Sequence, residues 1–248
     1  MRAVLVASSV LICGNAHAQF GPPPPLPGPA REAAPIDLTG QWVSVVTEDW
    51  RFRMAPPQRA DALPDGAPMT PAGIETFRSW DPRRDEAEGN ECKAYGAPGI
   101  MRMPGRIRVS WRDADTLEIQ ADAGRQTRVL SFGTPPANRE PTWQGVSRAE
   151  WILHRRGPQV QNGSLKVVTT GMRSGYLRKD GLPYTANATL TEYFDVLEHP
   201  DGSTWLVVKA IVHDAEYWMD EWIVSSNFRK EDGRGGWDPT PCSLLAPR

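Results

Sequence analysis

Long hydrophobic runs, common catalytic motifs and an excess of charge of one sign are all missing from this sequence. Its 28 Lys and Arg against 30 Asp and Glu give a formal net charge of −2, which is too balanced to drive binding to nucleic acid or to an anionic membrane. No segment approaches the roughly 20 apolar residues of a membrane-spanning helix, so we expect no stable membrane insertion. Gly-x-Ser-x-Gly, Walker, GxGxxG and HExxH motifs are also missing, so the common hydrolase, nucleotide, dinucleotide and zinc-protease classes lack their characteristic residues. We expect no cofactor.

The N-terminus has the pattern of a secretory signal peptide. An apolar run at residues 3–12 precedes Ala16-His17-Ala18, a small-x-small sequence typical of signal peptidase sites. Cys13 raises the alternative of a lipoprotein anchor, but Ile12 stands where a small residue is expected. The pattern predicts cleavage after Ala18 and a periplasmic or secreted protein.

Cysteine is scarce, with three residues in the chain. Removal of the signal peptide leaves Cys92 and Cys242 in an oxidising compartment, where an even number favours a disulfide over a metal site or a nucleophile. The alternative is a reactive thiol, although neither residue lies in a CxxC motif. A bridge would fix the C-terminus to the early part of the domain.

Proline and alternating apolar residues divide the rest of the chain. Seven prolines lie between residues 21 and 35, so residues 19–36 are expected to form an extended linker with no packed structure. Residues 37–248 are expected to form one domain. There, short alternating runs between turn residues indicate antiparallel strands, with Asn162-Gly163 and Pro200-Asp201-Gly202 as hairpin signals. The expected strands are 41–54, 106–112, 116–121, 126–132, 145–154, 164–170, 189–197, 204–213 and 221–228.

About nine strands and no βαβ alternation predict an all-β fold. One short helix is expected at residues 70–80, with Thr70 as its cap and Pro71 in its first turn. A single antiparallel up-and-down barrel or strongly curved sheet fits best, because closure removes exposed strand edges. Helical solenoids, Rossmann folds and P-loop folds do not fit the pattern.

Several motifs carry a resemblance to known proteins. Leu38-Thr39-Gly40-Gln41-Trp42 resembles the Gly-x-Trp start of lipocalin-like barrels, in which the Trp closes the barrel floor. The chain also resembles uncharacterised exported bacterial proteins that share four motifs. They are Cys-x-x-x-Gly-x-Pro-x-x-Met (92–101), Pro-Thr-Trp-x-Gly (141–145), Thr-Glu-aromatic-Phe (191–194) and His/Asp-Asp-x-x-Tyr (213–217). The resemblance implies a barrel but no particular activity, and the Pro-rich stretch 55–68 departs from the lipocalin pattern.

Glu192 is the strongest candidate for catalysis. Its strand alternates so that Glu192 shares a face with Leu190 and Phe194, and a carboxylate there must pair or shift its pKa. Asp214 could lie on the same side of the hairpin, and His213 could act as a base oriented by a carboxylate. The alternative is a Glu192 paired to Arg or Lys in a structural network. Adjacent residues of a strand face opposite ways, so no metal site is expected at 213–216.

Candidate ligand-binding residues come from a basic loop and from the ten tryptophans. Arg173 and Arg178 could clamp an anionic group, and Tyr176 and Tyr184 could donate hydrogen bonds. The alternatives are that the two arginines are simply exposed to water and that the two tyrosines only pack within the strands. Tryptophan lines apolar or aromatic pockets, for which Trp42 and Trp143 are the candidates, although several tryptophans are expected simply to fill the core.

Three functional hypotheses follow. The first is an exported barrel that binds a small, apolar or aromatic molecule in a Trp-rich cavity. The second is a cofactor-independent lyase, isomerase or hydrolase that uses Glu192 for proton transfer. The third is a structural envelope protein, in which Glu192 is fully paired to an arginine. The sequence leaves the oligomeric state open.

Overall fold

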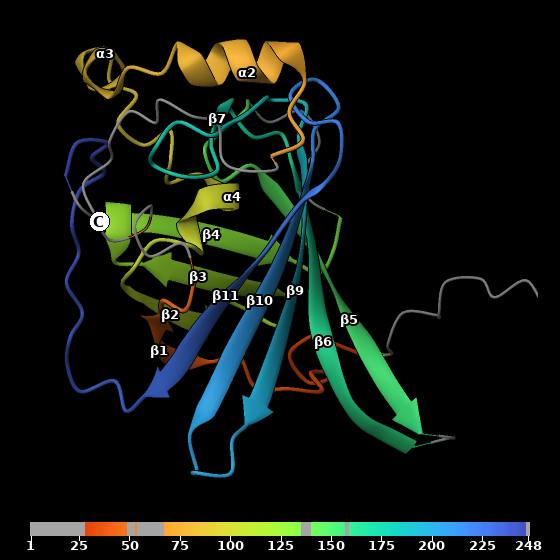
Figure 1. The fold of residues 1–248 in the computed structure, drawn as a ribbon. Coiled ribbons are helices and arrows are strands. Elements are labelled where there is room, and N and C mark those ends of the chain that lie inside the picture. Colours follow the sequence, from red (N-terminus) through yellow and green to blue (C-terminus); the bar gives the residue numbers. More distant parts are fainter. Residues whose placement is uncertain (1–27, 49–52, 54–66, 135–139, 157–158, 247–248) are drawn as a thin grey trace, which may run out of the picture.

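The computed structural model describes residues 28–48, 53, 67–134, 140–156 and 159–246 (Figure 1). The predicted signal peptide, residues 1–18, lies outside these ranges, and so do residues 19–27 of the predicted linker. Within the described residues, no helix is long and apolar enough to cross a membrane.

Nine strands of the described chain close into a barrel, which confirms the predicted all-β fold. Their order around the barrel is β1-β11-β10-β9-β6-β5-β4-β3-β2, and β2 pairs with β1. Every pairing is antiparallel except β4 with β5, which is parallel over only two residue pairs. The strands are β1 Gly40–Val45, β2 Arg106–Trp111, β3 Thr116–Ala121, β4 Gln126–Ser131, β5 Val146–Arg156, β6 Gln159–Thr170, β9 Thr189–Glu198, β10 Thr204–His213 and β11 Trp222–Glu231.

Two strands differ most from their expected bounds. β1 ends at Val45, well short of residue 54. Asn162-Gly163, expected to be a turn, lies inside β6. The Ile152 carbonyl group and the Pro35 ring both approach Gly163 closely. A Cβ atom there would lie 2.6 Å from the Ile152 carbonyl oxygen and would also overlap the Pro35 ring, so glycine is needed. A glycine inside a strand is typical of such a contact.

The inward faces of the strands pack into one hydrophobic core. Trp42 is completely buried in it, and its indole N–H donates to the Leu38 carbonyl oxygen at 2.9 Å. Large side chains from all parts of the barrel fill the interior with less than 2% exposure, including Leu117, Ile119, Leu130, Leu165, Phe194 and Phe228. The barrel interior also holds the ion pair of Arg128 with Glu192.

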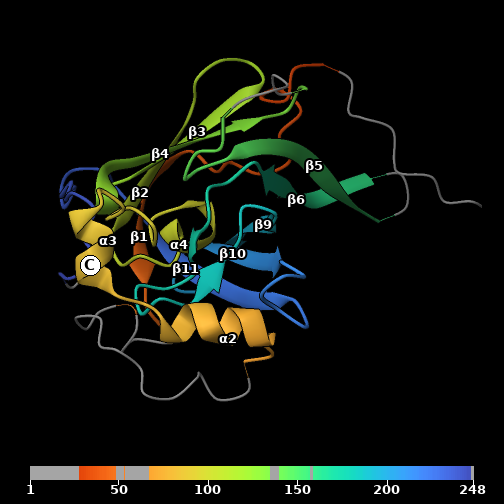
Figure 2. The same cartoon turned by 90° about the horizontal axis from the view of Figure 1, so that it is seen from above.

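A cap covers one end of the barrel, at the top of Figure 1. It contains three short helices, α2 Pro71–Arg78, α3 Pro82–Ala87 and α4 Ala97–Ile100, and the small hairpin of β7 Gly175–Tyr176 and β8 Pro183–Tyr184. Figure 2 looks down on this end and shows α4 inside the ring of strands. The predicted helix is α2, where the Thr70 hydroxyl accepts a hydrogen bond from Gly73 N at 3.2 Å and Pro71 begins the first turn.

The predicted disulfide joins Cys92 in the cap to Cys242 near the C-terminus. Its sulfur atoms are 2.01 Å apart and its Cα atoms 5.1 Å apart, across a sequence separation of 150 residues. In the chain-entropy model, closing a loop of this length stabilises the fold by about 5 kcal/mol.

The N-terminal segment, residues 28–36, packs against the other end of the barrel. Ala30 N donates to Asp115 Oδ1 at 2.8 Å, and Arg31 N donates to the Ala114 carbonyl oxygen at 2.9 Å. Ala30 is only 8% exposed. This part of the predicted linker is therefore packed, because its backbone finds partners in the β2–β3 turn.

Candidate functional site

An aromatic cluster of three rings lies at the barrel end that the N-terminal segment crosses. Trp111 and Phe132 are stacked with ring centroids 5.6 Å apart, and Trp151 lies 5.2 Å from Phe132 and 6.5 Å from Trp111. All three rings are half-buried and pack against the barrel core. The Trp151 indole N–H donates to the Ala30 carbonyl oxygen at 2.8 Å. Three flat apolar rings thus remain partly open to solvent at one place.

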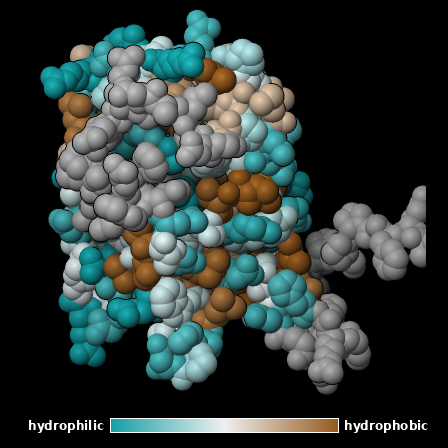
Figure 3. Space-filling model, in the orientation of Figure 1, coloured by the Kyte–Doolittle hydropathy of each residue, from teal (hydrophilic) through white to brown (hydrophobic). Residues whose placement is uncertain are grey.

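On the face shown in Figure 3, apolar side chains form separate small groups among polar ones. Isolated exposed apolar residues are normal on soluble proteins. The aromatic cluster differs from them because its rings contact one another as well as the core.

Glu192 lies inside the barrel, as its strand alternation predicts, and it is paired. Arg128 Nη1 donates to Glu192 Oε1 at 2.9 Å, and Arg128 Nη2 donates to Glu192 Oε2. Both side chains are 1% exposed. Both carboxylate oxygens are therefore held by the guanidinium, which is the state that the structural hypothesis expects of Glu192. A catalytic role for Glu192 stays a prediction.

Arg128 is a partner that the alternation of the Glu192 strand alone does not predict. It stands on β4 on the same face as Leu130, so the period of two that places Glu192 inward also places Arg128 inward. The bond spans the barrel interior from β4 to β9, past the two strands between them. Arg128 Nε is buried and has no hydrogen-bond partner among the described residues.

Asp214 and His213 do not join Glu192. Glu192 on β9 is paired with Ala210 on β10. Asp214 lies four residues beyond Ala210, which corresponds to about 13 Å along a strand. Asp214 is buried and accepts hydrogen bonds from Thr185 N at 2.6 Å and Thr185 Oγ1 at 3.1 Å. His213 is exposed. Asp214 thus orders the cap loop, at a distance from the Arg128–Glu192 pair.

Two of the predicted ligand-binding residues meet at the cap surface. The Arg173 guanidinium lies 4.1 Å from the centre of the Trp143 ring. Its Nη2 also donates to Asn90 Oδ1 at 3.4 Å. Arg173 is exposed and Trp143 is half-buried, so this pair is open to solvent from one side.

Tyr176, Arg178 and Tyr184 are buried inside the cap, whereas Trp42 is buried in the barrel core. Tyr176 OH donates to Asp85 Oδ2 at 2.6 Å, and burial together with the Asp85 carboxylate raises the pKa of the phenol. Arg178 Nε donates to Asp180 Oδ1 at 3.0 Å. Burial also raises the pKa of Tyr184, whose hydroxyl has no hydrogen-bond partner in the described part of the chain.

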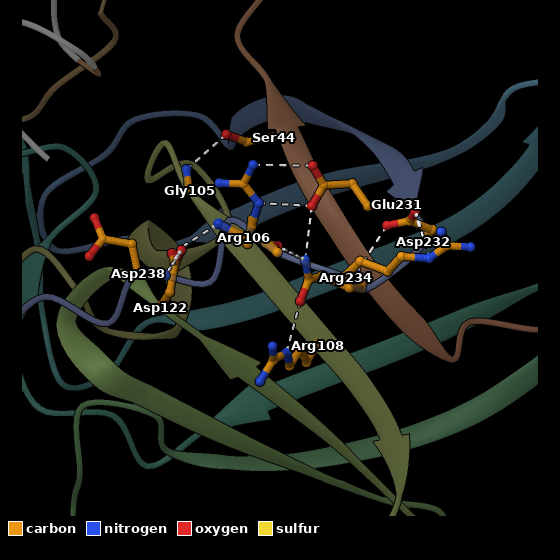
Figure 4. Close-up of polar contacts among 11 residues, drawn as sticks. Ser44, Gly105, Arg106, Arg108, Asp122, Glu231, Asp232, Arg234 and Asp238 are labelled. Carbon is orange, nitrogen blue, oxygen red and sulfur yellow. Dashed lines mark hydrogen bonds and ion pairs between the residues drawn. The ribbon is translucent and has the colours of Figure 1, made fainter.

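A polar network crosses the outside of the barrel where β1, β2 and β11 meet (Figure 4). Arg106 Nε donates to Glu231 Oε2 at 2.8 Å, and Gln41 Nε2 donates to the same oxygen at 3.0 Å. Arg108 Nε donates to Gln41 Oε1 at 2.9 Å. The hydrogen bond from Arg106 holds the pKa of Glu231 below its ordinary value. These groups satisfy one another, so the network joins strands and is a poor candidate for ligand binding.

Within the described residues, no group of three His, Cys, Asp or Glu side chains is placed to hold a metal ion. Comparisons with family models, with curated proteins and with solved structures found no match to this chain. The closed barrel is compatible with the lipocalin-like resemblance and with small-molecule binding, although lipocalin barrels have eight strands and this one has nine with one parallel pair.

Proposed function

We propose that this protein is an exported barrel that binds a small, flat, apolar or aromatic molecule at the aromatic cluster. The observation that carries the proposal is the group of three contacting rings, Trp111, Phe132 and Trp151, that stays half-exposed at one end of the barrel. Rings in this arrangement offer a large apolar area at a low cost in conformational entropy.

The position of the site follows from how the barrel is filled. Leu117, Leu130 and Leu165 are among the side chains that occupy the interior with no exposure. A ligand is therefore expected at the barrel end, against the cluster, and not in a central Trp-rich cavity. The N-terminal segment passes beside the aromatic cluster, since the Ala30 carbonyl oxygen accepts a hydrogen bond from the Trp151 indole N–H.

Export is supported by the disulfide and by the N-terminal sequence pattern. The Cys92–Cys242 bridge is of a kind that persists in oxidising compartments and is rare in the cytosol. A periplasmic or secreted binding protein combines these properties.

The test is a titration of the chain from Gln19 onward with the neutral fluorescent probe N-phenylnaphthylamine. Saturable binding is expected, with the dissociation constant raised about tenfold by Trp111→Leu or Trp151→Leu, as for an aromatic residue central to a binding site. The matched control is Trp205→Leu. Trp205 is also a half-buried strand tryptophan, and its indole N–H donates to Ser203 Oγ at 2.8 Å outside the cluster.

Two results would contradict the proposal. Binding that is equally strong in the Trp111→Leu/Trp151→Leu double variant would place the ligand elsewhere. Absence of binding by a folded wild-type chain, for this probe and for a panel of aromatic compounds, would favour the structural envelope hypothesis.

A further inference from the structure

The last part of the chain forms an arm that is separate from the barrel strands. Residues 237–246, here called the C-terminal arm, follow β11 through a hinge, Asp232-Gly233-Arg234-Gly235-Gly236. Gly233 and Gly236 have φ angles of 75° and 74°, which favour glycine. The arm runs along the outside of the barrel to the cap, on the left of Figure 1.

The first half of the arm lies against the barrel wall. The Arg108 guanidinium lies 4.3 Å from the centre of the Trp237 ring. Thr240 N donates to the Asp122 carbonyl oxygen at 3.0 Å, and Asp238 N donates to Asp122 Oδ2 at 3.4 Å. Figure 4 shows Asp122 and Asp238 side by side.

The second half of the arm is held by three cap residues, Glu86, Tyr95 and Lys179, here called the arm groove. Glu86 Oε1 accepts hydrogen bonds from Ser243 Oγ at 2.8 Å, Leu244 N at 2.7 Å and Leu245 N at 3.2 Å. Tyr95 OH donates to the Ser243 carbonyl oxygen at 3.0 Å, and Lys179 Nζ donates to the Ala246 carbonyl oxygen at 2.5 Å. The Leu244 side chain is completely buried.

These contacts recognise a peptide. One carboxylate binds a hydroxyl and two backbone N–H groups, an ammonium binds a backbone carbonyl, and the Leu244 side chain is buried in the hydrophobic core. Burial raises the pKa of Glu86, but the hydrogen bonds from Ser243, Leu244 and Leu245 outweigh it and hold that pKa below its ordinary value. The arm groove therefore fits an extended Ser-Leu-Leu-Ala segment, which then places Cys242 at Cys92.

We propose that the arm groove also accepts the arm of a second copy of this chain, so that two molecules exchange arms and form Cys92–Cys242 bonds between chains. Each contact of the groove with the arm is the same whichever chain supplies the arm. Only the hinge distinguishes the two cases, and an element joined by such a hinge can be exchanged between identical chains.

The exchange needs no net oxidation, because two bonds within chains are replaced by two bonds between chains. The tethered arm competes with an effective concentration of order mM. Exchange is therefore expected at high protein concentration, or when the bond within the chain is prevented.

The experiment mixes two chains from Gln19 onward, which lack Cys13, one carrying Cys92→Ser and the other Cys242→Ser. The mixture is incubated with glutathione disulfide, which takes two electrons and two protons from the thiols of Cys242 and Cys92 and becomes two molecules of glutathione. A disulfide-linked species of twice the chain mass is expected in the mixture. Each chain incubated alone should give far less of it.

The discriminating control moves the acceptor thiol out of the groove. A chain that carries Cys92→Ser, Cys242→Ser and Glu75→Cys has its one thiol at an exposed position of α2. It should give about tenfold less mixed dimer than the chain with Cys92, because the docked arm holds residue 242 beside Cys92 and not beside residue 75. Circular dichroism of each variant verifies that it is folded.

Two outcomes would overturn the proposal. If no mixed dimer forms between folded chains, the groove does not accept an arm from another molecule. If the dimer forms equally with the acceptor thiol at residue 75, the thiols meet by collision and the groove does not recognise the arm.

Discussion

Removing either partner of the Arg128–Glu192 pair should destabilise the protein far more than removing both. The two side chains are 1% exposed and share two hydrogen bonds. Glu192→Leu leaves the Arg128 charge buried without a partner, and Arg128→Met does the same to Glu192. Breaking a buried pair in this way typically costs about 3–5 kcal/mol, a large part of the roughly 5–15 kcal/mol that stabilises a native domain.

The double variant Arg128→Met/Glu192→Leu should recover most of that loss. It replaces both charges with apolar side chains of similar size, which is often neutral or stabilising in a protein interior. The assay is urea unfolding with the disulfide intact. With an m value of about 2 kcal/mol per M, each single variant should lower the midpoint by about 2 M, and the double variant should lie close to the wild type.

Additive effects would refute this reasoning. Residues that do not interact give a double variant whose loss equals the sum of the two single losses. A loss below about 1 kcal/mol for both single variants would equally show that the pair is not buried as described, since surface pairs contribute about that much.

Three further predictions concern other parts of the chain. Because burial lowers the pKa of Lys179 from 10.5 to about 8, the unfolded chain holds more protons than the folded chain between these values. The free energy of unfolding should therefore rise with pH across this window, by at most about 3 kcal/mol. Lys179→Met should flatten the rise in urea unfolding, and an unchanged slope would show that another group is responsible. Gly163→Ala should release the N-terminal segment from the barrel, because its Cβ atom would overlap the Pro35 ring, whereas a Cβ at Gly133 meets nothing within 4 Å. Faster hydrogen exchange of residues 28–36 in Gly163→Ala, but not in Gly133→Ala, is the expected result, and equal rates would contradict it. If Glu192 transfers protons, mass spectrometry of a metabolite extract should show a compound converted by the wild type and not by Glu192→Gln. Retention of compounds by both chains without conversion would leave Glu192 as a structural residue.

The sequence predicted which residues form strands and which side chains face inward, but not which inward side chains pair across the barrel. Alternation with a period of two directly determines which face a side chain takes, so the burial of Glu192 beside Leu190 and Phe194 followed from its own strand. Its partner did not follow, because β4 and β9 are neighbours neither in the sequence nor in the sheet. Arg128 could have been found only by searching every strand for a charge on an inward face.

Short and context-dependent features were harder to predict. α3 and α4 have six and four residues, too few to show a helical period. Asn162-Gly163 has the composition of a turn, but the glycine serves the packing of a distant segment. Arg178 was expected to grip a ligand, yet it is buried with Asp180 two residues away, and burial of a loop cannot be read from the loop alone.

The pairing of the first barrel strand with the last has a consequence for how the protein folds. Gln41 on β1 bonds to Glu231 on β11, 190 residues later in the chain. Barrel closure must therefore wait until β11 is available, whereas β2, β3 and β4 can pair locally without it. Contacts of such long sequence separation slow folding. We expect an early β2–β3–β4 meander and a late, rate-limiting step in which β1 and β11 meet.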